Sequence, residues 1–249
     1  MLSSTRQDAI LKRLRSDGEV LVATLATQLS VSTSTIRRDL DALSAEGVLR
    51  RVRGGGSRVE PDAIPFAEVS TQSSGDKDAI AFRAAQLVPD ESVVLIDIGT
   101  TTARLARQLR GRRLTVITSS LAVVDELRDE DCIQLIVLGG VLNNYLSLVG
   151  MLTEQALGQL RANLCFLSGS GVRPAGQVMD NTGIEVPVKR AMVAAAERTI
   201  LLVDRTKFPG TGLLSVCGPD QISTLVTNRG ADQATLDVFE AATTEVITV

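Results

Sequence analysis

The strongest constraint on the fold is an alternation that begins at Asp76 and continues to the end of the 249-residue chain. Short runs rich in Val, Ile and Leu alternate with segments whose apolar residues recur at helical spacing. The runs predict strands at Val93–Ile96, Leu114–Ile117, Ile133–Leu138, Leu164–Leu167, Ile200–Val203, Thr224–Thr227 and Val246–Val249. The segments predict helices at Asp76–Leu87, Thr101–Leu109, Leu121–Arg128, Leu152–Leu160, Glu185–Glu197 and Asp232–Ala242. This alternation is typical of an α/β domain with a mostly parallel sheet and helices on both faces.

The first 57 residues have a different pattern, which predicts a small, mainly helical domain. Three segments with helical periodicity, two of them ending near Gly18 and Gly47, are followed by a predicted strand at Val48–Val52 and a glycine-rich turn. Residues 58–75 show little periodicity and include two prolines, which predicts a linker. We therefore expect an N-terminal domain at 1–57 and a C-terminal domain at 76–249.

Composition and charge narrow the classes of function. Residues 1–58 carry a net charge of +4 and residues 59–249 a net charge of −7, so we expect only the N-terminal part to meet a polyanion. The chain has no histidine, which excludes Ser-His-Asp and Cys-His relays and His-containing metal sites. We expect no metal and no cofactor. Neither a signal peptide nor an apolar run of about 20 residues is present, so the sequence predicts a cytoplasmic protein with no membrane partner.

The segment Leu21–Leu43 has the spacing of a helix-turn-helix, with hydroxyl residues and then two arginines at the start of its second helix. Hydroxyls and free N–H groups at a helix start bind phosphates, and arginines reach base edges. The arginine-rich glycine turn after Gly47 resembles the wing of a winged helix. The expected DNA contacts are Ser32, Thr33, Ser34, Thr35, Arg37, Arg38, Arg51, Arg53, Gly54 and Gly55. A three-helix domain with solvated arginines is the alternative.

The same segment carries a family resemblance. The run VSTSTIRRDL (31–40) and the later Leu43, Gly47, Leu49, Arg51 and Gly54-Gly55 resemble the N-terminal signature of DeoR-type bacterial transcriptional regulators. Arg53 stands where the family's wing usually has a histidine, and it keeps a cationic donor. The resemblance implies a winged helix-turn-helix, double-stranded operator DNA as a partner, and a homodimer or homotetramer.

Glycines and polar residues follow most of the predicted strands of the C-terminal domain. Because the carboxyl ends of parallel strands share one edge, we expect them to converge on one crevice that can hold a phosphate and sugar hydroxyls. The sharpest motif, DIGTTT (97–102), presents N–H groups and hydroxyls to an anion, while Asp97 accepts a hydrogen bond from a sugar hydroxyl or from the loop. A simple strand-to-helix turn with a threonine cap is the alternative.

The region from about Asp76 to Asn228 resembles the DeoR-type effector domain, itself similar to ribose-5-phosphate isomerase. The resemblance implies phosphate binding by 99–102 and places Lys207, in the motif DRTK, near the ligand. The isomerase's acidic "D-G-A-D-E" and "R-E-K" stretches correspond to SGSGV (168–172) and PVK (187–189), so its proton-moving acids are missing. Glu185 is predicted to lie about half a helical turn from the required face. Both it and Lys189 are interpreted as either ligand contacts or structural groups.

The sequence therefore predicts a non-enzymatic regulator, a repressor of a sugar-metabolism operon controlled by a phosphorylated sugar. The expected effector residues are Asp97, Gly99, Thr100, Thr101, Thr102, Ser119, Ser120, Gly139, Gly140, Gly169, Gly171, Lys189 and Lys207. Two alternatives stay open: a constitutive DNA-binding protein whose larger domain serves only assembly, and a phosphosugar isomerase with an accessory DNA-binding head.

Overall fold

The structure is a computed structural model that describes residues 6–7, 9–11, 13–14, 19–45, 49–52, 54–58 and 66–249. The chain divides into two compact units, Met1–Ala63 and Ile64–Val249, each of which is described by itself. The stretch 58–75, predicted to be a linker, contains helix α4 (Phe66–Thr71) and the first residues of α5 (Ser74–Ala85). Within the described residues, no helix has the length and apolar character needed to cross a bilayer.

The first unit packs helices against a small antiparallel sheet. Residues 6–7, 9–11 and 13–14 are helical, and the later elements are β1 (Glu19–Leu21), α2 (Val22–Gln28), α3 (Thr33–Ala45), β2 (Leu49–Val52) and β3 (Gly55–Arg58). The strand order is β1-β3-β2. Ile10, Leu25, Ile36 and Leu40 form its core because they recur on the inward faces of the helices. A helix-turn-helix followed by a two-stranded wing is the result.

The second unit is built on a seven-stranded sheet in which every pair of neighbours is parallel. Its strands, in spatial order, are β15 (Glu245–Thr248), β14 (Thr224–Thr227), β12 (Ala196–Leu202), β9 (Ala162–Leu167), β4 (Val93–Ile96), β5 (Leu114–Thr118) and β6 (Ile133–Val137). This confirms the α/β fold class expected from the alternation.

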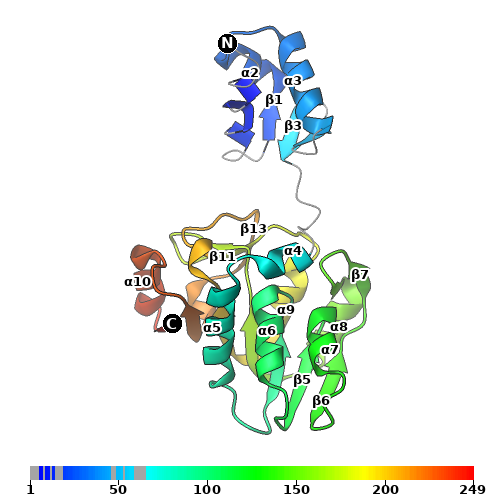
Figure 1. The fold of residues 1–249 in the computed structure, drawn as a ribbon, viewed down its shortest axis with the longest axis vertical. Helices are drawn as coiled ribbons and strands as arrows, with labels where there is room; N and C mark the ends of the chain where they lie inside the picture. Colours follow the sequence, from blue (N-terminus) through cyan, green and yellow to red (C-terminus); the bar gives the residue numbers. More distant parts are fainter. Residues whose placement is uncertain are drawn as a thin grey trace. The chain divides into compact units, whose positions relative to one another are not determined.

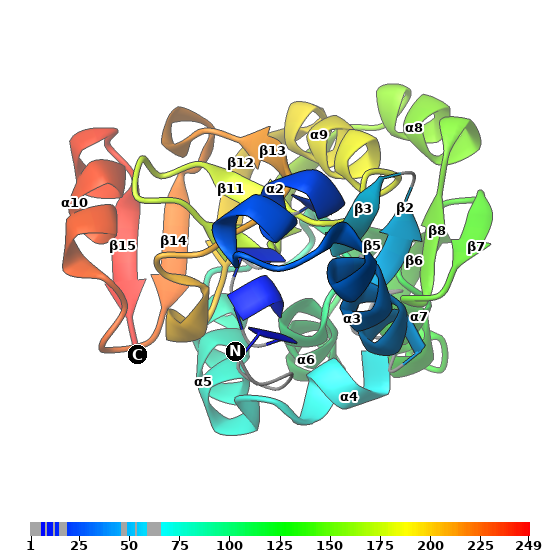
Figure 2. The same ribbon diagram turned by 90° about the horizontal axis from the view of Figure 1, so that it is seen from above.

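Helices cover both faces of that sheet (Figures 1 and 2). Side chains alternate along each strand, so Val94 and Ile96 of β4 face one core and Leu95 faces the other. The first core is covered by α5, α6 (Thr100–Gln108) and α7 (Leu121–Leu127). The second is covered by α8 (Met151–Gly158), α9 (Val186–Ala195) and α10 (Gln233–Ala241).

Several short elements outside the main sheet were not predicted. A hairpin of β7 (Val141–Asn143) and β8 (Ser147–Val149) follows β6. A second small antiparallel sheet contains β10 (Gly171–Val172), β11 (Val178–Asp180) and β13 (Leu214–Cys217). Two 3-10 turns, η1 (Arg205–Lys207) and η2 (Pro219–Gln221), precede β13 and β14 respectively. These elements are two to four residues long, too short to produce a recognisable period.

We predict that Gly55→Ala destabilises the first unit. A Cβ at Gly55 would lie 2.0 Å from the carbonyl oxygen of Val20, so the pairing of β3 with β1 would have to open. We expect the free energy of unfolding to fall by about 1–3 kcal/mol, the usual cost of overpacking a fixed site. Urea unfolding of the variant measures it. Gly75→Ala is the matched control, because its Cβ meets nothing within 4 Å; equal stability of the two variants would contradict the prediction.

Candidate functional site

The start of α3 is built by a hydroxyl cap. The Ser32 hydroxyl accepts a hydrogen bond from the backbone N–H of Thr35 at 3.2 Å, which satisfies one of the free donors of the first turn. Arg37 and Arg38 are exposed, whereas Ile36, the residue before them, is fully buried. The two guanidinium groups are therefore available to a partner, as the helix-turn-helix interpretation requires.

The aspartate of the TIRRDL run has a structural role. Asp39 is buried, and its two carboxylate oxygens accept hydrogen bonds from Arg6 at 2.5 and 2.9 Å. This bidentate salt bridge links α3 to the N-terminal helical residues and thereby fixes the orientation of the exposed face of α3.

The predicted wing lies between β2 and β3. Gly54 occupies the turn with a φ of +89°, a conformation that favours glycine, and Gly55 begins β3. The side chain of Arg51 and the whole of Arg53 lie outside what the structure describes. Thr33 and Ser34 are exposed at the start of α3, beside Ser32. The DNA contacts remain predictions at the level of single residues.

In the second unit, the expected effector residues follow strands at one edge of the sheet. We call the segments 97–102, 118–120, 168–171 and 204–207 the carboxyl rim; they follow β4, β5, β9 and β12. The strand order reverses between β4 and β9: the chain runs outward from β4 to β6, and later outward from β9 to β15. Ligands of parallel α/β sheets bind at the carboxyl ends of the strands flanking such a reversal. Here those ends carry Asp97 and Ser168.

The DIGTTT turn leads from β4 directly into α6. Gly99 has a φ of +142°, and a Cβ there would lie 2.8 Å from the Ser168 hydroxyl, so glycine is required where these two rim segments touch. Thr100, Thr101 and Thr102 form the first turn of α6 and are buried. No side chain caps this helix, and its first turn holds no acidic residue. Its N-terminal N–H groups therefore carry the positive end of the helix dipole at the carboxyl rim.

Three cations lie near one another, and one of them, Arg104, donates to the Thr100 carbonyl at the start of α6 at 3.4 Å. Lys77 of α5 is 4% exposed, and its electrostatic neighbours are Asp204, Lys207 and Arg104. Burial lowers the pKa of Lys77 to about 8, and Lys207 and Arg104 act in the same direction, whereas Asp204 opposes them. Arg104 also pairs with Asp78 at 2.7 Å, and the buried ammonium of Lys77 beside further cations is a group that an anion stabilises.

A second cluster of charges surrounds Lys189, which is 2% exposed. Its Nζ lies 2.5 Å from Asp97 Oδ2 and 3.5 Å from Asp180 Oδ2. Burial by itself lowers the pKa of Lys189, but the carboxylates of Asp97, Asp180 and Glu185 together raise it above its ordinary value. Asp97 Oδ2 also accepts hydrogen bonds from the Ser168 N–H at 2.9 Å and the Ser168 hydroxyl at 2.8 Å. The carboxylate of Asp97 is therefore used to hold the loop and the lysine.

Glu185, expected about half a helical turn from the face that catalysis would require, lies beside Lys189 in the structure. Glu185 directly precedes α9 and lies four residues before Lys189, so both side chains lie on one face of the helix. Glu185 Oε1 accepts hydrogen bonds from the Ser147 hydroxyl at 2.8 Å and the Asn143 amide at 3.1 Å. Burial raises the pKa of Glu185, partly opposed by Lys189 and by the bond from Ser147. A carboxylate therefore accompanies the buried ammonium of Lys189 on the same helix face.

The remaining predicted effector residues follow strands at the same edge of the sheet, and several of them have structural roles there. Ser120 caps α7 by accepting from the N–H of Val123, and Ser119 is covered by the hairpin, since its carbonyl accepts from the N–H of Leu148. The glycines are placed by packing. A Cβ at Gly140, Gly169 or Gly171 would meet protein atoms at 3.0 Å or less, and Gly139 binds Thr153 through its carbonyl.

Unpartnered polar atoms also mark this edge of the sheet. Among the described residues, three buried side-chain polar atoms have no hydrogen-bond partner within the protein: Ser119 Oγ, Thr227 Oγ1 and Asn228 Oδ1. All three lie at the carboxyl end of β5 or of β14. Three strands, β12, β9 and β4, separate the two groups, so Ser119 alone lies within the carboxyl rim and is available to a hydrogen-bonding ligand there.

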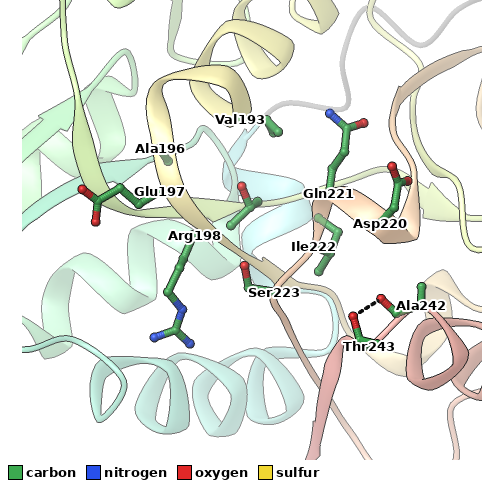
Figure 3. A pocket seen from close by; sticks show the side chains of 11 residues that line it. Val193, Ala196, Glu197, Arg198, Asp220, Gln221, Ile222, Ser223, Ala242 and Thr243 are labelled. Atoms are coloured by element: carbon green, nitrogen blue, oxygen red, sulfur yellow. Dashed lines mark hydrogen bonds between the residues drawn. The ribbon is translucent and has the colours of Figure 1, made fainter.

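A separate cavity lies at the opposite edge of the sheet, beside the amino ends of β12, β14 and β15 (Figure 3). Glu197, Arg198, Asp220 and Thr243 are among the residues that line it. It contains none of the predicted effector residues and is distinct from the carboxyl rim.

The fold and the two sites define a winged helix-turn-helix joined to an α/β domain with a polar, cation-lined rim. Models of the DeoR-like helix-turn-helix domain and the DeoR C-terminal sensor domain match residues 6–61 and 72–229. The chain belongs to the DeoR family of transcriptional regulators.

Curated relatives agree with this assignment. The chain is 32% identical to the HTH-type transcriptional regulator GolR of Listeria innocua, over 97% of each chain. It is 31% identical to the lactose phosphotransferase system repressor of Lactococcus lactis, over 98% of each. A ribose 5-phosphate isomerase A from Methanocaldococcus jannaschii is similar at 17% identity, over 55% of each chain with a TM-score of 0.41.

We predict that Lys189→Met strongly destabilises the second unit, because it leaves Asp97 and Asp180 buried without their cation. Loss of one partner from a buried pair usually costs about 3–5 kcal/mol, and urea unfolding measures it. The double variant K189M/D97N should recover part of the loss. Arg113→Ala is the control: its pair with Glu91 spans 3.5 Å, and both side chains are more than 70% exposed. It should change stability by less than about 1 kcal/mol. If K189M lowered the free energy of unfolding by as little as R113A does, the proposed role of the buried pair would be refuted.

Proposed function

We propose that this protein represses a sugar-metabolism operon and that a phosphorylated sugar, bound at the carboxyl rim, controls its affinity for operator DNA. The observation that carries the proposal is the combination, at the carboxyl rim, of an uncapped helix start, buried cations and the unpartnered hydroxyl of Ser119. That combination suits a ligand with an anionic end and a hydroxyl-bearing body.

The start of α6 would receive the phosphate. Helix N–H groups and nearby ammonium and guanidinium groups are the usual donors to phosphate oxygens. Lys77 and Lys207 approach this point from α5 and η1, and Arg104 extends from α6 itself. A dianion placed among them would offset the mutual repulsion that helps to lower the pKa of Lys77.

The cluster around Lys189 would receive the sugar. Its carboxylates, amide and hydroxyls are acceptors and donors of the kind that bind sugar hydroxyls. Gly99 and Ser168 touch, so the phosphate end and the sugar end are contiguous along the rim. We propose binding without turnover, because Asp97 is already engaged by Lys189 and Ser168, and Glu185 by Ser147 and Asn143. Both carboxylates are therefore poor proton acceptors. Conversion of an aldose phosphate to a ketose phosphate by the purified protein would overturn this part.

The first unit would bind the operator through α3 and the wing. A palindromic operator requires a two-fold protein, so we propose a homodimer or homotetramer. The sugar phosphate must bind the DNA-free arrangement more tightly, since equal affinity for both arrangements would shift nothing.

A thermal-shift panel tests the sensor. Ribose 5-phosphate, glucose 6-phosphate, fructose 6-phosphate and glycerol 3-phosphate are each compared with inorganic phosphate and with the parent alcohol or sugar. A ligand that binds only the folded state raises Tm by mass action. We expect at least one phosphate ester to raise Tm more than inorganic phosphate and to weaken binding to an operator selected from random duplexes. No shift with any ester would overturn the proposal.

We predict that R37A/R38A abolishes operator binding and leaves the thermal shift unchanged, because these two arginines are exposed on α3 and lie outside the second unit. Fluorescence anisotropy with labelled operator at fixed salt measures the first effect. R128A/R161A, which removes two exposed arginines of the second unit, is the matched control and should bind operator normally. Equal operator affinity for the two double variants would refute the assignment of α3.

We predict that affinity for the phosphate ester falls as the pH rises through about 8. Lys77 loses its proton in this range, and a phosphate dianion favours the charged form. Isothermal titration from pH 6.5 to 9.5 measures the profile. Lys77→Met should weaken binding about 10- to 100-fold at pH 7, the scale of one charge-assisted hydrogen bond, and should remove the transition near pH 8. Lys207→Met is the control that removes an equal charge and keeps the transition. A transition that survives in K77M would assign it to another group.

A further inference from the structure

Helix α4 is the first element of the second unit. Only seven residues, 59–65, separate it from β3, the last strand of the DNA-binding unit. It is six residues long, and none of its residues is buried. A helix this short is not stable by itself in water. Its position therefore depends on the few groups that hold it.

Three side chains of the second unit hold α4, and their contacts with it are at Phe66, Val69 and Ser70. Lys77 Nζ donates a hydrogen bond to the Val69 carbonyl at 2.7 Å, and Arg104 Nη2 donates to the Ser70 carbonyl at 2.9 Å. At the other end, the ring of Phe66 meets the ring of Tyr145 edge-on, with centroids 5.5 Å apart and planes at 66°. Figures 1 and 2 show α4 beside α6.

Each of these groups also belongs to one end of the proposed ligand site. Arg104 donates to the Thr100 carbonyl at the start of α6, and Lys77 is its electrostatic neighbour. Tyr145 lies in the turn of the β7–β8 hairpin, between Asn143 and Ser147, the two residues that bind Glu185. The charges of Lys189, Glu185, Asp180 and Asp97 all act on Tyr145, while burial raises its pKa to about 12. Both ends of the site are thus one contact away from α4.

We propose that α4 is the element that transmits occupancy of the carboxyl rim to the DNA-binding unit. The inference rests on the proposed function and specifies how the same site is regulated. A phosphate oxygen beside Lys77 and Arg104 competes with the Val69 and Ser70 carbonyls for the same donors. A sugar bound by the Glu185 cluster changes the position of the β7–β8 hairpin, whose Tyr145 contacts Phe66. Both effects shift α4 between two positions, and α4 is joined to β3 by only seven residues.

The contact between Phe66 and Tyr145 offers a specific test. Phe66 helps to hold α4 in place, and it is not one of the residues proposed to bind the ligand. The variants are Phe66→Ala and, as the matched control, Phe82→Ala, whose ring is 59% exposed on α5. In the full-length protein, operator affinity is measured with and without the phosphate ester that gives the largest Tm rise in the panel, at saturation. We expect wild type and F82A to show a change of about 5- to 150-fold, the usual range of allosteric coupling. F66A should change less than about twofold while keeping its ester-induced Tm rise.

The outcomes separate the two proposals. If no ester raises the Tm of the wild type, the proposed function fails and the inference fails with it. If F66A keeps both the Tm rise and the wild-type operator response, the ligand site stands and α4 is not the transmitter. If F66A loses the Tm rise itself, Phe66 supports ligand binding rather than transmission, which also overturns the inference.

Hydrogen exchange provides a second measurement that requires no substitution. The amides of Phe66–Thr71 should exchange at a different rate when the same ester saturates the wild-type protein, because the carbonyl contacts of α4 change. The amides of α10 at the far edge of the sheet serve as the internal reference. Identical exchange of the α4 amides with and without the ester would overturn the inference.

Discussion

The buried pair of Lys189 and Asp97 fixes the geometry on which the rest of the candidate site depends. It joins α9, on one face of the sheet, to the carboxyl end of β4 at the strand-order reversal. The same aspartate holds Ser168 at the end of β9, so one carboxylate positions both central loops. Charges this deeply buried are tolerated only when they are paired and fully hydrogen-bonded, which makes the cluster rigid as well as polar.

The two charged clusters of the rim differ in their balance. The cluster at Lys189 contains three carboxylates and one ammonium, so its cation is over-compensated. The cluster at Lys77 contains three cations and two carboxylates, Asp204 and the Asp78 that pairs with Arg104 at 2.7 Å, so one positive charge is left uncompensated. A molecule with an anionic end and a hydroxylated body matches this gradient when its anion lies at Lys77, and it is mismatched when reversed. The electrostatics thus favour one orientation of the ligand.

Periodicity was sufficient to predict the sheet, the main helices and the glycine and threonine turn after β4. It missed the β7–β8 hairpin, whose three-residue strands show no period, and consequently missed Tyr145 and Ser147. Asp180 was missed because nothing local links it to Lys189, and only the chain's return through β11 brings the two together. Such contacts are set by tertiary packing, which the sequence pattern does not encode.

Two other residues of the site could have been identified from their helical spacing in the sequence. Lys77 lies at helical spacing with Ile80, Ala81 and Ala84, so a lysine stands on the apolar stripe of α5, where burial and a special role are to be expected. Glu185 precedes Lys189 by four residues, the spacing of one helix face. That spacing alone predicts a carboxylate beside the lysine.

The cations hold α4 through its main-chain carbonyls, at Val69 and Ser70. A carbonyl is present whatever the side chain, so substitutions at most positions of α4 leave these two attachments intact. Only the aromatic ring at its first residue is tied to a particular side chain. Natural variation or engineering can therefore alter the surface of this helix, and with it the partners or stiffness of the junction, while the sensing domain keeps its hold on the segment.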